Sequence, residues 1–294
     1  MAPDITAAAA FMTGHARLLD RRRFDVRFRG EAPDAVLAAL EAYRNPDGGY
    51  GALEPDLRAV ESQPVGAMHA FEVFEDTGPG TSPRATELCG WLASVSLADG
   101  GLPFALPVAD ATATAPFWAQ ADPTLSSLHI TAAVAAVAHR VARHDCGVAD
   151  HPWLRGVTRY CLDTVDGREK PESTLELLYS LAFLDAVADG EPAASGLIDR
   201  LAQAIPPSGV LPVEGGLEDE VRRPLELSPL PDRPLRRHLA PEVVSADLGC
   251  LAAEQRDDGG WEVDFASCSP AAALEWRGYA TVRALTVLRA NGRI

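Results

Sequence analysis

The chain has 294 residues, of which 47% are hydrophobic, and this is enough for one large core or two smaller ones. Its formal net charge of −16 repels phosphate backbones and anionic lipids, so we expect no nucleic-acid partner. Ala, Leu, Glu and Arg fill the periodic stretches, whereas alternating runs of β-branched residues are scarce. This pattern predicts an all-α protein.

The N-terminal region and the cysteines predict a cytoplasmic protein. The apolar run ITAAAAFM lacks a positively charged start and is interrupted by His15 and Arg17, so we expect no signal peptide. No run approaches the roughly 18 apolar residues of a membrane span. The five cysteines include no C-x-x-C pair, and most lie among apolar residues, which predicts buried free thiols.

A short glycine turn recurs along the chain, each time after a helical stretch. An acidic residue or serine followed by glycine ends a helix sharply, because glycine accepts positive φ. The copies at 164–169 and 207–213 are degenerate. The turns occupy 45–51, 97–104, 164–169, 207–213 and 256–262, and the helices predicted before them cover 34–44, 84–96, 151–164, 194–205 and 241–255.

A second helix is predicted after four of these turns, starting near Pro64, Pro123, Pro171 and Pro270. The fourth unit instead carries an irregular, proline-rich insertion at 209–240. One such unit cannot bury its apolar face, so neighbouring units must stack. Neither end of the chain resembles a polar cap, and we therefore expect the units to close into a ring.

Closure would place the long links 51–62, 102–121 and 209–240 on one rim, around the N-termini of the second helices. Long loops on a rigid scaffold are where functional sites usually lie. We expect a single domain over 1–294, an α/α toroid of about five to six helical hairpins with Gly-Gly turns.

The last repeat carries a family resemblance. Gln255, Gly259 and Trp261 fit the Q-x-x-x-G-x-W core of the QW repeat of squalene–hopene cyclases, and Leu251 stands four residues before the glutamine. The Gly-Gly turns are similar to those of protein prenyltransferase β subunits. The chain thus resembles the small, single-toroid bacterial members of the prenyltransferase and squalene oxidase repeat superfamily. The resemblance implies a double ring of helices in which Gln255 and Trp261 clamp neighbouring helices.

The catalytic motifs of that superfamily are missing from the sequence. There is no D-x-D-D tetrad for alkene protonation and no C-G-E-Q thioester sequence. The zinc motif D-x-C is not matched, because Asp264 and Cys268 are four residues apart instead of two. We therefore expect no metal and no cofactor, and the resemblance supports the fold more than any activity.

The densest acidic group on the expected rim is LEPDLRAVES. Glu54 and Asp56 stand two residues apart and could share a proton, which would raise the pKa of one of them. Alternatively, they are solvated and cap the next helix. Glu275, on the last helix, is the third catalytic candidate, with the alternative that a neighbouring helix satisfies it. Asp247 is expected to face solvent.

Aromatic residues make up only 6% of the chain, so their positions carry information. Several fall on the expected rim or inner helices, where they could line an apolar cavity or belong to the ordinary core. The arginines of 209–240 could bind a diphosphate, but nearby acids favour internal pairing. The candidate binding residues are Tyr50, Phe104, Phe117, Trp118, His129, Trp276 and Arg277.

Three functions remain open at this point. The first is a terpene cyclase-like enzyme that binds a small apolar (isoprenoid) substrate and protonates it from Glu54 or Asp56, with Trp118 and Trp276 stabilising cations. The second is a non-catalytic toroid that binds a hydrophobic ligand or a partner peptide. The third is prenyl transfer without the usual zinc site. A dry pocket around a protonated carboxylate favours an enzyme, and a polar open groove favours a binding protein.

Overall fold

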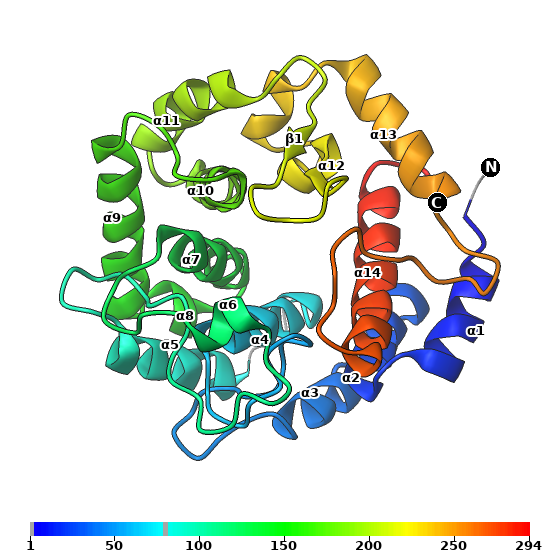
Figure 1. Cartoon of the computed structure of the whole chain (residues 1–294), viewed down its shortest axis with the longest axis horizontal. Coiled ribbons are helices and arrows are strands. Elements are labelled where there is room, and N and C mark those ends of the chain that lie inside the picture. Colours follow the sequence, from blue (N-terminus) through cyan, green and yellow to red (C-terminus); the bar gives the residue numbers. More distant parts are fainter. Residues whose placement is uncertain (1–2, 79–81) are drawn as a thin grey trace.

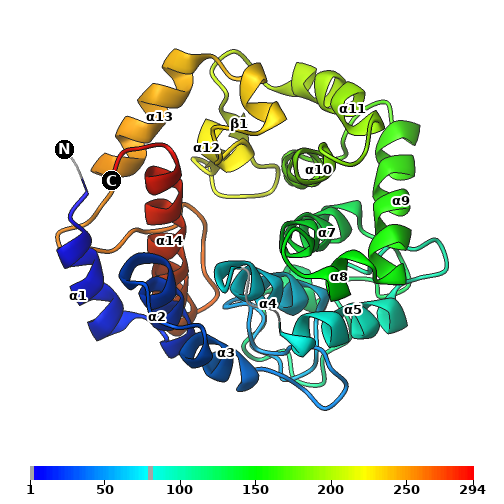
Figure 2. The ribbon, with the colours of Figure 1, turned by 180° about the vertical axis from the view of Figure 1, so that it is seen from behind.

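The computed structural model describes residues 3–78 and 82–294, and helices dominate it. Figure 1 shows the longer helices in two layers around a ring, and Figure 2 shows the same ring from behind. The outer layer contains α1 (Ile5–His15), α3 (Asp34–Glu41), α5 (Pro83–Val95), α9 (Pro152–Gly167), α11 (Ala193–Leu201) and α13 (Pro241–Ala253). The inner layer contains α4 (Pro64–Asp76), α7 (Leu128–Ala142), α10 (Thr174–Val187) and α14 (Pro270–Ala290).

Shorter elements connect these layers. Helix α2 (Leu18–Phe24) continues as a π-helical turn over Asp25–Arg29 and packs against both α3 and α14. Two-residue strands β1 (Leu211–Pro212) and β2 (Val221–Arg222) pair antiparallel in the proline-rich insertion. The remaining pieces are α6 (Pro116–Ala119), α8 (Cys146–Ala149), α12 (Pro224–Leu227) and 3-10 turns at Ala202–Ala204 and Pro234–His238.

The predicted helices are confirmed in place, with two shifted starts. Helices α7 and α10 begin after their prolines, at Leu128 and Thr174, because Ser127 and Ser173 cap them through their hydroxyl oxygens. Helices α1 and α2 were not predicted. The side chain of Asp4 caps α1 by accepting hydrogen bonds from the backbone N–H of Thr6 and Ala7.

Three glycine turns share one geometry. Asp47, Asp99 and Asp258 each accept a hydrogen bond through Oδ1 from the N–H two residues later, at 2.9, 3.0 and 3.1 Å. The glycine that follows each aspartate has a φ of 92–93°, as the prediction of positive φ requires. The degenerate copy at 164–169 is different, because Gly167 still belongs to α9.

The sequence QRDDGGW closes the ring onto α1. The side chain of Gln255 accepts a hydrogen bond from the N–H of Asp4 at 2.7 Å and donates one to its carbonyl at 2.8 Å. The indole of Trp261 donates to the carbonyl of Leu251 at 2.8 Å, and its backbone N–H donates to Thr281 on α14 at 3.0 Å. Gln255 and Trp261 therefore join neighbouring helices, as the resemblance implies.

Two expectations about individual side chains are wrong. Asp247 is 8% exposed, and its carboxylate accepts a hydrogen bond from the N–H of Leu225, so it holds α12 against α13. Most cysteines were expected to be buried, but only Cys89 and Cys161 are, whereas the other three are exposed. The helical phase of Asp247 did not reveal that α12 covers it, and the apolar sequence neighbours of the exposed cysteines did not ensure their burial.

Substitution of Gly259 by alanine should destabilise the protein strongly. A Cβ there would lie 2.2 Å from the carbonyl oxygen of Ala7, on a backbone with positive φ. Strain and overpacking together should lower the free energy of unfolding by roughly 3 kcal/mol or more in urea titrations. Gly249→Ala is the matched control, because its Cβ meets no atom within 4 Å and the site is an exposed helix face. Equal stability of both variants would contradict the close contact of Gly259 with Ala7 and the need for glycine at this φ.

Candidate functional site

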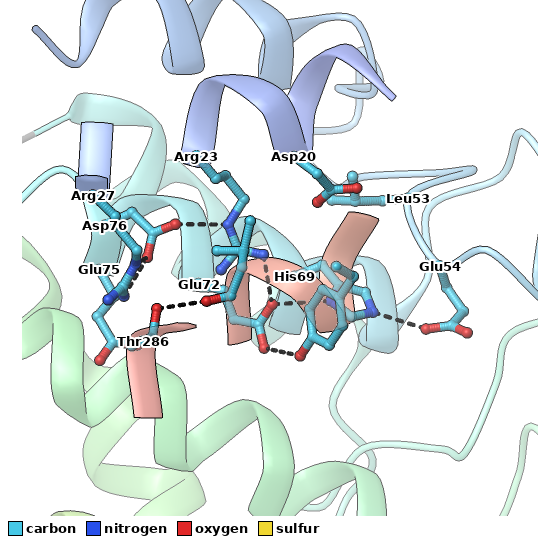
Figure 3. Close-up of polar contacts among 12 residues, drawn as sticks. Asp20, Arg23, Arg27, Leu53, Glu54, His69, Glu72, Glu75, Asp76 and Thr286 are labelled. Carbon is cyan, nitrogen blue, oxygen red and sulfur yellow. Dashed lines mark hydrogen bonds and ion pairs between the residues drawn. The ribbon is translucent and has the colours of Figure 1, made fainter. Parts of the chain in front are cut away.

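The most heavily connected polar cluster lies around His69 on α4 (Figure 3). His69 is 2% exposed, and both of its ring nitrogens face carboxylates. Nε2 donates to Glu54 at 2.8 Å, and Nδ1 donates to Glu72 at 3.1 Å. An ionised carboxylate only accepts, so a doubly protonated imidazolium can donate to both acids at once.

The surroundings of His69 shift the pKa values of two groups. Burial alone would lower the pKa of His69, but the hydrogen bonds and charges of Glu54 and Glu72 raise it to about 9. Burial would raise the pKa of Glu72, but His69, Arg23 and Tyr279 lower it to about 2. The pair is therefore a stable buried ion pair at neutral pH.

Further charges connect α4 to α2 and α14. Arg23 pairs with Asp76 at 2.6 Å and with Glu72 at 3.4 Å, and Arg27 also pairs with Asp76. The hydroxyl of Tyr279 donates to Glu72 at 2.7 Å. Burial, followed by the charge of Glu72, raises the pKa of Tyr279 well above its usual value. Figure 3 shows this chain of contacts running from Asp76 to Glu54.

Asp56 is buried and serves as a hydrogen-bond acceptor. Its Oδ1 accepts from the hydroxyl of Ser267 at 2.9 Å and the N–H of Cys268 at 2.7 Å. Its Oδ2 accepts from the indole of Trp276 at 2.7 Å. All three donors belong to the segment 267–276. Asp56 thereby fastens the segment before α14 to the loop 51–62, while Glu54, two residues away, contacts His69 instead.

Glu275 and Arg277 also have partners within the fold. Glu275 forms ion pairs with Arg58 at 2.6 Å and with Arg17 at 3.8 Å. Arg277 pairs with Asp258 at 2.7 Å, and its guanidinium lies 4.6 Å from the ring centre of Phe11. The alternative was that a neighbouring helix satisfies a buried Glu275, but Glu275 is half-buried and its partners lie in the loop 51–62 and just before α2.

The predicted aromatic residues lie in separate places, and Phe117 joins the group of Trp118, whose ring centre is 5.4 Å away. Trp118 stacks on Phe104 with ring centres 4.4 Å apart, and Phe104 in turn meets His129 at 5.6 Å. Burial lowers the pKa of His129 to about 4, so this ring is neutral. Trp276 contacts the edges of the His69, Phe265 and Tyr279 rings. Tyr50 is 1% exposed within the core, and Phe117 is 59% exposed.

Sequence reasoning missed His69, Glu72 and the arginines that pair with them. The spacing of His69, Glu72 and Asp76 puts all three on one face of α4, and this was the available signal. The internal pairing predicted for the insertion is confirmed for Arg222, which contacts Glu220 at 2.6 Å. Arg223 and Arg237 instead pair with Glu254 and Asp199, outside the insertion.

Neither a metal cluster nor a membrane helix is found among the residues described. Within 3–78 and 82–294, no group of three His, Cys, Asp or Glu side chains is arranged to hold a metal. In the same ranges, no helix combines the length and hydropathy needed to cross a bilayer.

No family model matches the chain, and no curated protein matches it either.

The pH dependence of stability should report on the His69 cluster. The folded pKa of His69, about 9, exceeds the ordinary 6.5, so its stabilisation is complete below pH 6.5 and is lost as the pH rises through 9. The loss should be on the order of 3 kcal/mol. Glu72 acts oppositely, since its stabilisation is present above pH 4.5 and disappears as the pH falls toward 2.

Urea unfolding of wild type and His69→Gln at pH 6, 7.5 and 9 measures this directly. The variant should be less stable at pH 6 and should lack the decline toward pH 9. His139→Gln is the control, because the pKa of His139 is lowered to about 4 by burial and so contributes no slope above pH 6.5. If the free energy of unfolding of His69→Gln still fell toward pH 9, the imidazolium would not be the source of that fall.

Proposed function

We propose that the protein is an α/α toroid that binds a segment of a partner protein on the rim formed by its long loops. The alternation of outer and inner helices supports the toroid. The shared geometry of the turns at Asp47, Asp99 and Asp258 supports the resemblance to the prenyltransferase and squalene oxidase repeat. Binding is favoured over catalysis because the long loops expose apolar side chains, whereas the acidic residues beneath them are paired within the fold.

The exposed apolar side chains of the long loops carry this proposal. Val60, Phe117 and Leu125 are 73%, 59% and 63% exposed, and all three precede inner helices. Leu217 in the insertion and Leu274 in the first turn of α14 are 51% and 38% exposed. Exposed apolar surface of this kind is typical of protein–protein contacts, whereas small-molecule sites enclose their ligands.

The acids beneath the rim do not favour proton transfer. Asp56 accepts from three donors, and Glu54 receives a hydrogen bond from the His69 imidazolium. An imidazolium with a pKa of about 9 is too weak an acid to protonate an alkene. These groups instead hold the loop 51–62 in place. The net charge of −16 further favours a partner segment with basic residues.

The second candidate is acid-initiated cyclisation of an isoprenoid. One observation favours it, because Trp276 donates to Asp56 and contacts the rings of Phe265 and Tyr279, so aromatic groups and an acid meet at one place. Aromatic faces stabilise cationic carbon. For this chemistry, Glu54 or Asp56 would have to bind a proton against the donors that now surround it.

Peptide selection tests the binding proposal. A random nonapeptide library displayed on phage should yield peptides that bind the wild-type protein. Phe117→Ser and Leu125→Ser should each weaken their binding about fivefold or more in fluorescence anisotropy, as expected where an exposed anchor contributes at least about 1 kcal/mol. Leu18→Ser is the matched control, since Leu18 is 56% exposed but lies on α2. A library without binders, or binders indifferent to both rim variants, would contradict the proposal.

Incubation with prenyl diphosphates and free polyprenols tests the second candidate. We expect no cyclised product by gas chromatography with mass detection, because the acids are engaged. A product that disappears in Glu54→Gln or Asp56→Asn would instead establish the cyclase. Both variants should be compared at equal folded fraction, since Asp56→Asn also weakens the contact with Cys268.

A further inference from the structure

A groove lies on the rim beside the first Asp-Gly-Gly turn, and none of the residues around His69 lines it. Its volume is about 590 Å³, and it is open to solvent. Pro46, Val60, Leu106 and Pro107 give it apolar walls, and Asp47 and Glu61 contribute carboxylates. Its open shape suits part of a partner chain better than an enclosed small molecule.

Hydrogen bonds fix the walls of this groove. Asn45 donates through Nδ2 to the carbonyl of Val60 at 2.7 Å, which joins the turn to the loop 51–62. Gln63 accepts from the N–H of Leu106 at 2.8 Å and donates to its carbonyl at 3.1 Å. Glu61 accepts from the N–H of Ala109 at 3.1 Å. Walls that are already ordered reduce the entropy cost of binding a ligand.

The ionisable side chains that line the groove are all acidic. No Lys, Arg or His is among its lining residues. Asp47 accepts hydrogen bonds from Ser62 at 2.8 Å and from the indole of Trp91 at 3.1 Å, so it supports the wall. Within the part of the chain that the structure describes, Glu61 accepts a hydrogen bond only from the backbone N–H of Ala109. A cationic side chain next to an apolar one is the complement of this surface.

We propose that this groove binds a short, extended segment of a partner protein that carries an apolar residue beside a lysine or arginine. The inference rests on the proposed binding function and gives it a place and a partner chemistry. The apolar side chain lies between Val60, which is 73% exposed, and Pro107, while the cation pairs with Glu61. Other rim residues then extend the contact.

Two synthetic nonapeptides provide the test, one with an Arg-Leu-Pro-Leu-Arg centre and one with Glu-Leu-Pro-Leu-Glu. The basic peptide should bind the wild-type protein, and its affinity should fall with added salt. The acidic peptide should not bind. Glu61→Gln keeps an oxygen for the N–H of Ala109 but removes the charge, so it should weaken binding about threefold to tenfold and flatten the salt dependence.

Val60→Ser should weaken binding by a similar factor, while Leu18→Ser should bind as wild type does. Thermal melting of each variant confirms that the fold is intact. Library-selected peptides could lose affinity for Phe117→Ser and Leu125→Ser but not for Val60→Ser or Glu61→Gln. In that case the peptides do not bind in the groove, and only the proposal of a binding surface elsewhere on the rim remains. If no peptide binds at all, both proposals fall.

Discussion

The ring depends on the close approach of each Asp-Gly-Gly turn to the outer helix of the next unit. A Cβ on Gly49 would lie 2.5 Å from the Trp91 ring on α5, and one on Gly101 would lie 2.5 Å from the Tyr160 ring on α9. At the last turn, Gly260 meets Phe11 on α1 in the same way. The turn after α13 therefore packs against α1 in the same way as the earlier turns pack against α5 and α9. This contact closes the ring.

Closure has a consequence for the ionisable residues of the rim. The loop 51–62 crosses from α3 to α4, and three of its charged side chains reach α4, α14 or the segment before α14. Glu54 contacts α4 through His69, Asp56 contacts the segment before α14, and Arg58 pairs with Glu275 on α14. Buried charges need partners, and here those partners belong to different parts of the ring. The polar cluster thus stabilises the loops in one arrangement.

Local sequence was sufficient for the outer helices other than α1 and for the three Asp-Gly-Gly turns, because helical periodicity and the positive φ of glycine are local properties. It was insufficient for the site. Tyr279 and Glu72 are 207 positions apart in the sequence, and Asp56 and Trp276 are 220 apart. Glu54 and Asp56 were predicted as acids that could share a proton, but their contacts depend on hydrogen-bond donors from other parts of the chain. Those donors become neighbours only when the ring closes.

The interior and the rim of the ring differ in the functions that their side chains allow. Proton transfer to an apolar substrate requires an acid that keeps its proton in a dry pocket. Asp56, Glu54 and Glu275 instead contact an indole, an imidazole and an arginine, all of which are hydrogen-bond donors. On the rim, by contrast, Val60 and Phe117 expose apolar surface that no element of the described chain covers. Loops fastened from beneath by ion pairs can present such side chains without reorganising when a partner binds.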